Sequence, residues 1–435
     1  MIRDTADSVV LPVWVPCMVQ NFSKSTKRDW TVPRTKSLEK AEMSVPEGVL
    51  PRQEIMKLVN NRHIWSDFTI KDQQFQPASL DLRLGEKAHR VQCSFLPGKR
   101  TVESRLSDST IHALSLGVDG AVLEPGLVYI IPLMERFSLP EGIRARANPR
   151  SSTGRLDIFT RVITNYSDHF DEIQDTYEGP LFLEFLSRSF PVRITRGLSL
   201  TQVRFIRGNC RCTDEDIIDL HERGEVLLYD ESESVQIGEI MLREGLFLRV
   251  DLRGICGTRC VGYKAKKHRR LIDLERVKYY RILDFWEPVY REKDGKIILE
   301  KDDFYLLTSK EKVSIPRNYA AEMVAYEQTS GELRTHYAGF FDPGFGYGPE
   351  GNVKGTVAVM EVRALDAPFM VEDGQRFCKL QLEKMAETPD VIYGAKEIGS
   401  AYQFQGLTPS KHFVPLEIEI EEIKKHERIE QLTFA

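Results

Sequence analysis

The sequence repeats itself once, and this duplication limits the folds open to the chain more than any other feature. The segment VYIIPLMERFSLPEGI, which begins at Val128, aligns with FYLLTSKEKVSIPRNY, which begins at Phe304, at an offset of 176 residues. Further on, SFPVRITRGLSLTQVRF aligns with DAPFMVEDGQRFCKLQL at an offset of 177. A looser match pairs SLDLRLG at Ser79 with RVDLRGI at Arg249. Steady offsets over this length indicate a tandem duplication.

Each copy reads as short strands of alternating or wholly apolar residues, such as LVYIIPL and TVAVMEV, separated by Gly, Pro and charged turns. Helical periodicity is brief, in PRQEIMKLVNN from Pro51 and in residues 214–222. This pattern predicts a mainly β protein with a sandwich or distorted barrel in each copy. The predicted order is a poorly packed N-terminal extension (1–42), copy 1 (43–213), a connector (214–243) and copy 2 (244–435).

Composition narrows the class of protein. The 435 residues are 41% hydrophobic and 29% charged, with a net charge of −5, so we expect a globular protein that does not coat nucleic acid. No segment approaches the roughly 20 apolar residues of a membrane span, and no secretory signal is evident. Seven cysteines, an odd number, are typical of a reducing compartment, which predicts a cytoplasmic protein.

The cysteine pairs Cys210/Cys212 and Cys256/Cys260 lack the usual spacing of zinc ligands, and we expect free thiols. The H-x-E and P-C-x-x-C signature of zinc nucleobase deaminases is also absent from the sequence.

The turn NPRSSTGRLD, residues 148–157, concentrates groups that bind phosphate. Arg150 and Arg155 supply two guanidinium forks, and Ser151 and Ser152 supply small donors that let the backbone approach an anion. The alternative is a solvated turn that carries two arginines.

Two glutamates stand in apolar strands, Glu361 in AVMEV and Glu184 in LFLEF, at corresponding places in the two copies. Burial raises the pKa of a carboxyl group toward neutrality, where one group can both accept and return a proton. The alternative is that each is an outward-facing strand acid.

Five motifs in order, QPASLDLRLG, RSSTGR, DPG, a strand glutamate and YQFQG followed by Ser410, resemble the dCTP deaminase branch of the dUTPase-like superfamily. The resemblance covers residues 46–413 and is strongest to the long, tandem-domain bacterial members. It implies a distorted, jelly-roll-like β-barrel in each copy, sites where barrels meet, and a homo-oligomer such as a trimer. It also implies hydrolytic deamination of dCTP to dUTP and ammonia without zinc, with Mg²⁺ bound through the triphosphate.

The two copies keep complementary parts of the family pattern. Copy 2 has EQTSGE (327–332) in place of RSSTGR, and only copy 2 has HYAGFFDPGFG (336–346) and a following YQFQG. One composite site per chain is therefore expected, with Glu361 as the catalytic acid/base and Glu184 as a relic or structural acid. The substrate-binding residues implied are Arg150, Ser151, Ser152, Thr153, Gly154, Arg155, His336, Ala338, Asp342, Val359, Met360, Tyr393, Lys396, Tyr402 and Gln405.

Two departures from the family stand out. The insertion YGPEGNVK lengthens the interval between Asp342 and Glu361. Ala401 replaces the lysine that usually precedes the lid tyrosine, so Lys396 or Lys411 would have to reach the phosphates. Two rival functions stay open: dUTP or dCTP diphosphohydrolysis on the same fold, and a non-catalytic nucleotide-sensing protein.

Overall fold

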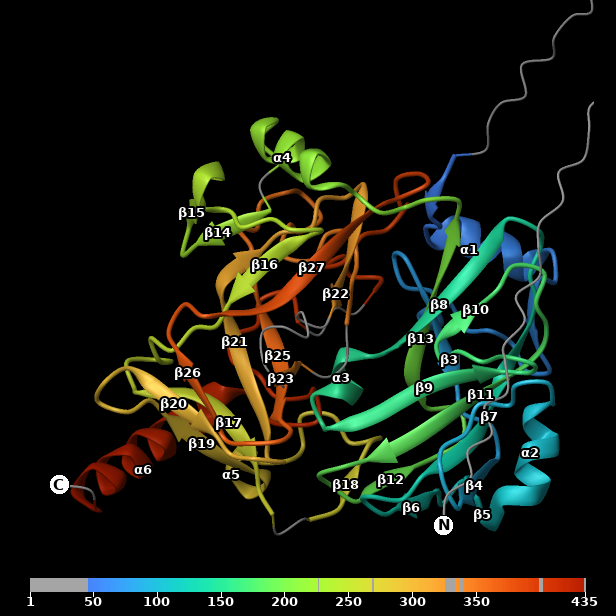
Figure 1. The fold of residues 1–435 in the computed structure, drawn as a ribbon, viewed down its shortest axis with the longest axis horizontal. Helices are drawn as coiled ribbons and strands as arrows, with labels where there is room; N and C mark the ends of the chain where they lie inside the picture. Colours follow the sequence, from blue (N-terminus) through green and yellow to red (C-terminus); the bar gives the residue numbers. More distant parts are fainter. Residues whose placement is uncertain are drawn as a thin grey trace, which may run out of the picture. The chain divides into compact units, whose positions relative to one another are not determined.

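A computed structural model describes residues 46–225, 227–267, 270–324, 333–335, 339–398 and 402–433. Pro46–Ala435 form one compact unit, whereas the predicted N-terminal extension lies outside the described residues. Strands dominate this unit, and they separate into a blue-to-green set from copy 1 and a yellow-to-red set from copy 2 (Figure 1). The prediction of a mainly β fold with two tandem barrels is confirmed.

In its described residues, the first copy contains three α-helices and a series of strands. Its elements are β1 (Gly48–Val49), α1 (Arg52–Asn60), β2 (Ile64–Ser66), β3 (Leu80–Arg83), β4 (Lys87–Val91), α2 (Val102–Ser109), β5 (Thr110–Ser115), β6 (Ala121–Leu123), β7 (Tyr129–Ser138), β8 (Ile143–Pro149), α3 (Ser151–Gly154), β9 (Ile158–Thr164), β10 (Glu172–Ile173), β11 (Glu178–Ser187), β12 (Val192–Ile194) and β13 (Ser199–Arg207).

The rest of the chain begins with a helix and ends with one. Its elements are α4 (Asp214–Glu222), β14 (Leu228–Asp230), β15 (Glu233–Ser234), β16 (Leu246–Arg249), β17 (Cys260–Ala265), β18 (Ile272–Asp273), α5 (Ile282–Phe285), β19 (Trp286–Tyr290), β20 (Lys296–Leu299), β21 (Phe304–Val313), β22 (Tyr319–Val324), β23 (Leu333–Thr335), β24 (Phe340–Phe341), β25 (Thr356–Ala364), β26 (Phe369–Glu372), β27 (Arg376–Lys384) and α6 (Ile420–Thr433).

The sheets of the two copies correspond. In copy 1, β13 lies between β8 and β3, and β7 pairs with β11. In copy 2, β27 lies between β22 and β16, and β21 pairs with β25. Successive side chains of a strand point to opposite faces of the sheet. In β25, Glu361 thus lies on the same face as Val359, whereas Met360 points into the apolar core of copy 2.

One detail of the predicted repeat is wrong. The backbone N–H of Arg83 donates to Glu135 (2.7 Å), and that of Arg249 donates to Glu311 (2.9 Å), so Arg83 and Arg249 are equivalent. The predicted match instead aligned Ser79 with Arg249, because the letters DLR occur in both segments. In each copy a buried glutamate pairs with this arginine and fixes the register, since a slip would leave the glutamate charge unpaired.

The two copies share apolar packing. The Phe190 ring of copy 1 lies 5.5 Å from Trp286 and 5.9 Å from Phe285 of copy 2, both in edge-on contact. Strand β18 also pairs in parallel with β12 of copy 1. Edge-on aromatic pairs and a shared ladder fix the two barrels against each other.

Charged side chains are buried where sheet β8–β13 meets sheet β22–β27. Arg204 is fully buried and donates to Glu383 of copy 2 at 2.7 Å. Arg146 lies 2.8 Å from Glu322, its equivalent in the repeat. Pairing compensates for the high cost of burying these charges and ties copy 1 to copy 2 beside the candidate site.

The two predicted helices form as α1 and α4, whereas α2, α3, α5 and α6 were not predicted. Residues of the predicted connector pack on copy 2, where Leu228 of β14 pairs with Val313 of β21. The six cysteines in the described ranges are free thiols, as expected. Within those ranges, none of the helices has the length and apolar character needed to cross a membrane.

Candidate active site

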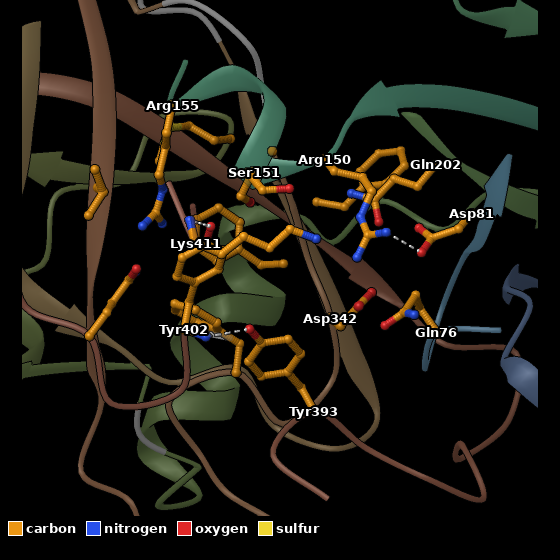
Figure 2. Close-up of a pocket in the computed structure, with 18 of the residues that line it drawn as sticks. Gln76, Asp81, Arg150, Ser151, Arg155, Gln202, Asp342, Tyr393, Tyr402 and Lys411 are labelled. Carbon is orange, nitrogen blue, oxygen red and sulfur yellow. Dashed lines mark hydrogen bonds and ion pairs between the residues drawn. The ribbon is translucent and has the colours of Figure 1, made fainter. Parts of the chain in front are cut away.

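One pocket lies between the two copies and draws residues from both (Figure 2). It brings together ten of the predicted site residues: Arg150, Ser151, Ser152, Arg155, Asp342, Val359, Glu361, Tyr393, Tyr402 and Gln405. The first four come from copy 1 and the other six from copy 2. All of them belong to one chain.

The turn between β8 and β9 forms the short helix α3 and carries the arginines. Arg150 lies 2.7 Å from the carboxylate of Asp81, which comes from β3 (Figure 2). Thr153 is buried and donates its hydroxyl hydrogen to the carbonyl of Leu200, which anchors the turn on β13. The turn thus presents Arg150, Ser151 and Ser152 to the pocket, with Thr153 behind them.

Gly154 lets this turn touch the carboxylate of Glu361. A Cβ atom at position 154 would lie 2.5 Å from Oε2 of Glu361, closer than real Cβ atoms come to other atoms. A larger residue would therefore displace the carboxylate of Glu361 or the turn itself. This close approach gives Gly154 a physical role, although its position is behind the pocket wall.

Glu361 is a buried acid whose Oε2 has no hydrogen-bond partner in the described part of the chain. Burial raises its pKa well above the ordinary value, Arg155 opposes this shift, and Asp157 adds to it. A carboxyl group in this setting can hold a proton near neutral pH and exchange it with a bound molecule.

The segment 402–413 covers Arg155. The guanidinium lies over the ring of Tyr402, 4.0 Å from its centroid, and donates to the carbonyl of Thr408 (2.9 Å). Ser410 donates to the carbonyl of Ser152 (2.6 Å), so the same segment is fastened to the phosphate turn. The C-terminal motif and RSSTGR therefore meet within one chain.

Lys411 lines the pocket and is the nearer of the two lysines considered from the sequence, since Lys396 is not among the lining residues. Burial lowers the pKa of Lys411 to about 8, and Arg150 adds to this effect while Asp81 opposes it. Its backbone N–H donates to the hydroxyl of Tyr402 (3.0 Å). Lys411 is thus held as a titratable cation beside Arg150.

The loop after β24 forms the other wall. Burial raises the pKa of Asp342 to about 6, although Arg204 lies 3.6 Å away. The ring of Phe345 packs against Phe341 (5.0 Å) and Tyr393 (5.7 Å). A polar acid beside a cluster of rings suits a ligand with both a hydroxyl-bearing and a flat part.

Some predicted residues are not in the pocket wall. Met360 points into the core of copy 2, as the alternation of β25 requires. His336 and Ala338 lie outside the described residues. Sequence reasoning did not place the following lining residues in the site: Gln76, Asp81, Gln202, Met323, Gly339, Phe340, Phe341, Phe345 and Ile398. The motif QPASLDLRLG contains Gln76 and Asp81, and HYAGFFDPGFG contains Gly339 and the three phenylalanines, so these two motifs were the available signal. Gln202 of β13 carries none.

The corresponding place in copy 1 is occupied by other side chains. Arg161 pairs with Glu184, with Nε 3.0 Å from Oε1. Asn165, the first residue of NYSDHF, accepts a hydrogen bond from the backbone N–H of Val102 at the start of α2 (2.8 Å). Glu184 is therefore held in an ion pair, in contrast to Glu361.

Two sequence models of one family match the chain. The 2'-deoxycytidine 5'-triphosphate deaminase (DCD) N-terminal domain matches residues 46–209, and the C-terminal domain of the same family matches residues 213–413. A crystal structure of 2'-deoxycytidine 5'-triphosphate deaminase from Agrobacterium tumefaciens is 42% identical with a TM-score of 0.73, over 78% of this chain and 99% of that one. The chain belongs to the dCTP deaminase family.

Other members of the dCTP deaminase family match a shorter part of the chain. A dCTP deaminase, dUMP-forming, from Methanosphaera stadtmanae is 28% identical over 160 residues, 36% of this chain and 78% of the relative. A dCTP deaminase from Halorubrum lacusprofundi is 31% identical over 136 residues, 31% of this chain and 64% of the relative. Matches of this length correspond to about one copy of the duplication.

The described part of this dCTP deaminase family member holds no group of three or more His, Cys, Asp or Glu side chains placed to bind a metal ion. Of the carboxylates in the pocket, Asp81 faces Arg150 and Asp342 faces Arg204. The side chains that remain for a ligand are cations, hydroxyls, amides, rings and the acid Glu361.

Proposed function

We propose that this protein is a dCTP deaminase that hydrolyses dCTP to dUTP and ammonia without zinc. One observation carries the proposal: the buried carboxyl group of Glu361 touches the turn that bears Arg150 and Arg155, within one pocket. The pocket thus holds cations that can bind a triphosphate next to a carboxyl group that can transfer protons. Membership of the dCTP deaminase family supports cytosine as the base.

The triphosphate would bind to the cations of the phosphate turn. Arg150 now faces Asp81, and Arg155 lies against Tyr402 and the carbonyl of Thr408. Phosphate oxygens would compete with these contacts, because charge-assisted and bidentate bonds to phosphate are the stronger ones. Lys411 would add a further positive charge below its pKa of about 8.

Magnesium would reach this site on the nucleotide. The pocket carboxylates Asp81 and Asp342 already face arginines, so phosphate oxygens are the better ligands for the ion. Bound there, Mg²⁺ would neutralise part of the triphosphate charge.

Glu361 would serve as both base and acid. Its carboxylate accepts a proton from water while the water oxygen bonds to C4 of cytosine and the C4=N3 double bond opens, and the carboxyl group gives this proton to N3. The same group then passes the proton of the new C4 hydroxyl to the departing amine, the C4–N bond breaks, ammonia leaves and the C4 carbonyl of uracil forms. Both steps need a pKa near the working pH, and burial moves the pKa of Glu361 in that direction.

A product assay tests the proposal. Purified protein is mixed with dCTP and Mg²⁺, and ammonia, dUTP, dUMP and pyrophosphate are measured together. Ammonia in equal amount to dUTP is the expected result. Pyrophosphate without ammonia would make the protein a diphosphohydrolase, and tight dCTP binding without any product would make it a nucleotide sensor.

A second candidate is deamination followed by release of pyrophosphate. The observation in its favour is the name of the Methanosphaera stadtmanae relative, which is dUMP-forming. Here the carboxylate of Asp81, whose pKa burial raises to about 6, lies beside Arg150 and could orient a water toward a phosphate. If so, Asp81→Asn should abolish pyrophosphate while ammonia is still produced.

A further inference from the structure

Behind Glu361 lies a buried ion pair that the proposed chemistry does not use. Arg363 of β25 pairs with Asp157, which directly follows Leu156 at the end of the phosphate turn. Asp157 is fully buried and Arg363 nearly so. Like the pocket, the pair takes one residue from each copy.

Asp157 closes the phosphate turn through its backbone. Its φ of 58° lies in the left-handed region, which a glycine would adopt more readily. Its N–H donates to the carbonyl of Gly154 (2.8 Å), and its carbonyl accepts from the N–H of Arg188 (3.0 Å). Because the backbone favours glycine, the contacts of the carboxylate are the physical reason for an aspartate here.

Those contacts fix a cation near Glu361. The carboxylate of Asp157 accepts from the hydroxyl of Ser189 (2.6 Å) as well as from Arg363. Arg363 follows Glu361 by two residues on β25, so both side chains leave the same face of the strand. The other end of the guanidinium donates to the carbonyl of Asp302.

Two charged groups act on Glu361 from the elements packed against it. Arg155, from the phosphate turn, favours its ionised form, and Asp157 favours its protonated form. Without the carboxylate at 157, Arg363 would lose its acidic partner, and Glu361 would be the carboxylate nearest along the same strand face.

We propose that Asp157 is a positioning residue, which holds Arg363 away from Glu361 and keeps the phosphate turn against β25. This inference rests on the proposed role of Glu361 as acid/base. It concerns a pair that lies outside the pocket wall and touches neither the reacting atoms nor the phosphates.

The test compares Asp157→Asn with the double variant Asp157→Asn/Arg363→Met. Asp157→Asn should lower kcat about tenfold or more with a smaller change in KM, because Arg363 is then left to pair with Glu361. The ionisation of Glu361 should appear as one limb of the plot of kcat/KM against pH. In Asp157→Asn this limb should move to lower pH by about one unit, because the negative charge of Asp157 no longer raises the pKa of Glu361. Removal of Arg363 as well should restore most of the lost kcat and return the limb toward its original pH.

The control is Asp273→Asn, which breaks another ion pair between the copies, with Arg193 at 2.8 Å, away from the pocket. Asp273→Asn should leave the pH profile unchanged even if it lowers the unfolding temperature. If Asp157→Asn lowers the unfolding temperature but leaves the limb in place, or if the double variant recovers nothing, the pair is merely structural and the proposal fails.

A readout without turnover separates this inference from the proposed function. Unfolding temperatures are measured against pH with and without Glu361→Gln, and the difference reports Glu361 alone. Its folded pKa lies above its unfolded one, so its ionisation lowers stability as pH rises between the two values. Asp157→Asn should lower the folded pKa of Glu361. The loss of stability with rising pH should then be smaller and should end at a lower pH. An unchanged decline would overturn the proposal even in a protein that makes no dUTP.

Discussion

At the scale of single residues, Glu361 and Glu184 make a natural comparison, since they occupy equivalent places in the two copies. Glu361→Gln should lower kcat by about 10² to 10⁴-fold, because an amide keeps the shape of the side chain but cannot accept a proton from water. Binding of dCTP, measured by calorimetry, should change little. Loss of binding in parallel with kcat would mean that Glu361 holds substrate and does not transfer protons.

Glu184→Gln is the matched control. It breaks the pair with Arg161, and we expect a lower unfolding temperature with kcat per folded molecule preserved. If Glu184→Gln is the inactive variant and Glu361→Gln stays active, the two copies have the opposite roles.

The arginines of the phosphate turn should discriminate between ligands. Arg150→Ala and Arg155→Ala should each weaken dCTP binding by about 1.5 to 3 kcal/mol, which is the usual value of a charge-assisted contact. Binding of deoxycytidine, which has no phosphate, should be far less affected. Equal losses for both ligands would show that the arginines only maintain the fold.

At the scale of elements, the segment 402–413 brings a positive charge to the pocket through Lys411. The pKa of Lys411 is lowered to about 8, so Lys411 is protonated below that pH and loses its charge above it. We expect kcat/KM for dCTP to fall as pH rises through about 8, because this ratio reports the free enzyme. Lys411→Arg should keep the charge and remove that fall, and an unchanged alkaline limb would exclude Lys411 as its source.

Elements also show where the sequence was informative. The helices α1 and α4 have apolar spacing that the sequence displays, and both were predicted. Helix α2 was not predicted, because only Val102 and Leu106 of its eight residues are buried, although Thr101 caps it by accepting from the backbone N–H of Ser104. The N–H of Val102 also donates to Asn165, a tertiary contact that no local pattern displays. For the same reason the match of Ser79 with Arg249 failed, since ion pairs on the buried Glu135 and Glu311 fix the register.

At the scale of the whole molecule, the pocket needs both copies of one chain. Neither copy expressed alone should turn over dCTP, because Arg155 and Glu361 belong to different copies. Chains with Arg155→Ala and chains with Glu361→Gln, produced together under different tags, should give no activity in the mixed assembly. Each chain then carries one lesion in its own pocket.

Recovery of activity in the mixed assembly would show that functional sites join residues from different chains. Activity from either copy alone would contradict the composite site itself. Purified mixed assemblies and single-tag assemblies serve as matched samples, and their oligomeric state is measured by light scattering.

Much of the site could be predicted because charged and acidic residues in strand contexts are visible in the sequence. The two barrels followed from the repeat, and ten of the predicted residues do line one pocket. The rest depends on which faces meet. Gln202 is an ordinary strand residue until β13 packs beside β24, and Met360 lies next to Glu361 but faces the core because a strand alternates.

The residues that line the pocket are far apart in the sequence. They run from Gln76, in the early part of the unit 46–435, to Lys411, in its late part. Domains fold largely in order as they leave the ribosome. Copy 1 can therefore form its barrel, with the phosphate turn in place, while copy 2 is still being made. The proposed enzyme gains its activity only when the last part of the chain arrives and Ser410 docks on Ser152. A chain cut short during synthesis would be inert toward cellular dCTP.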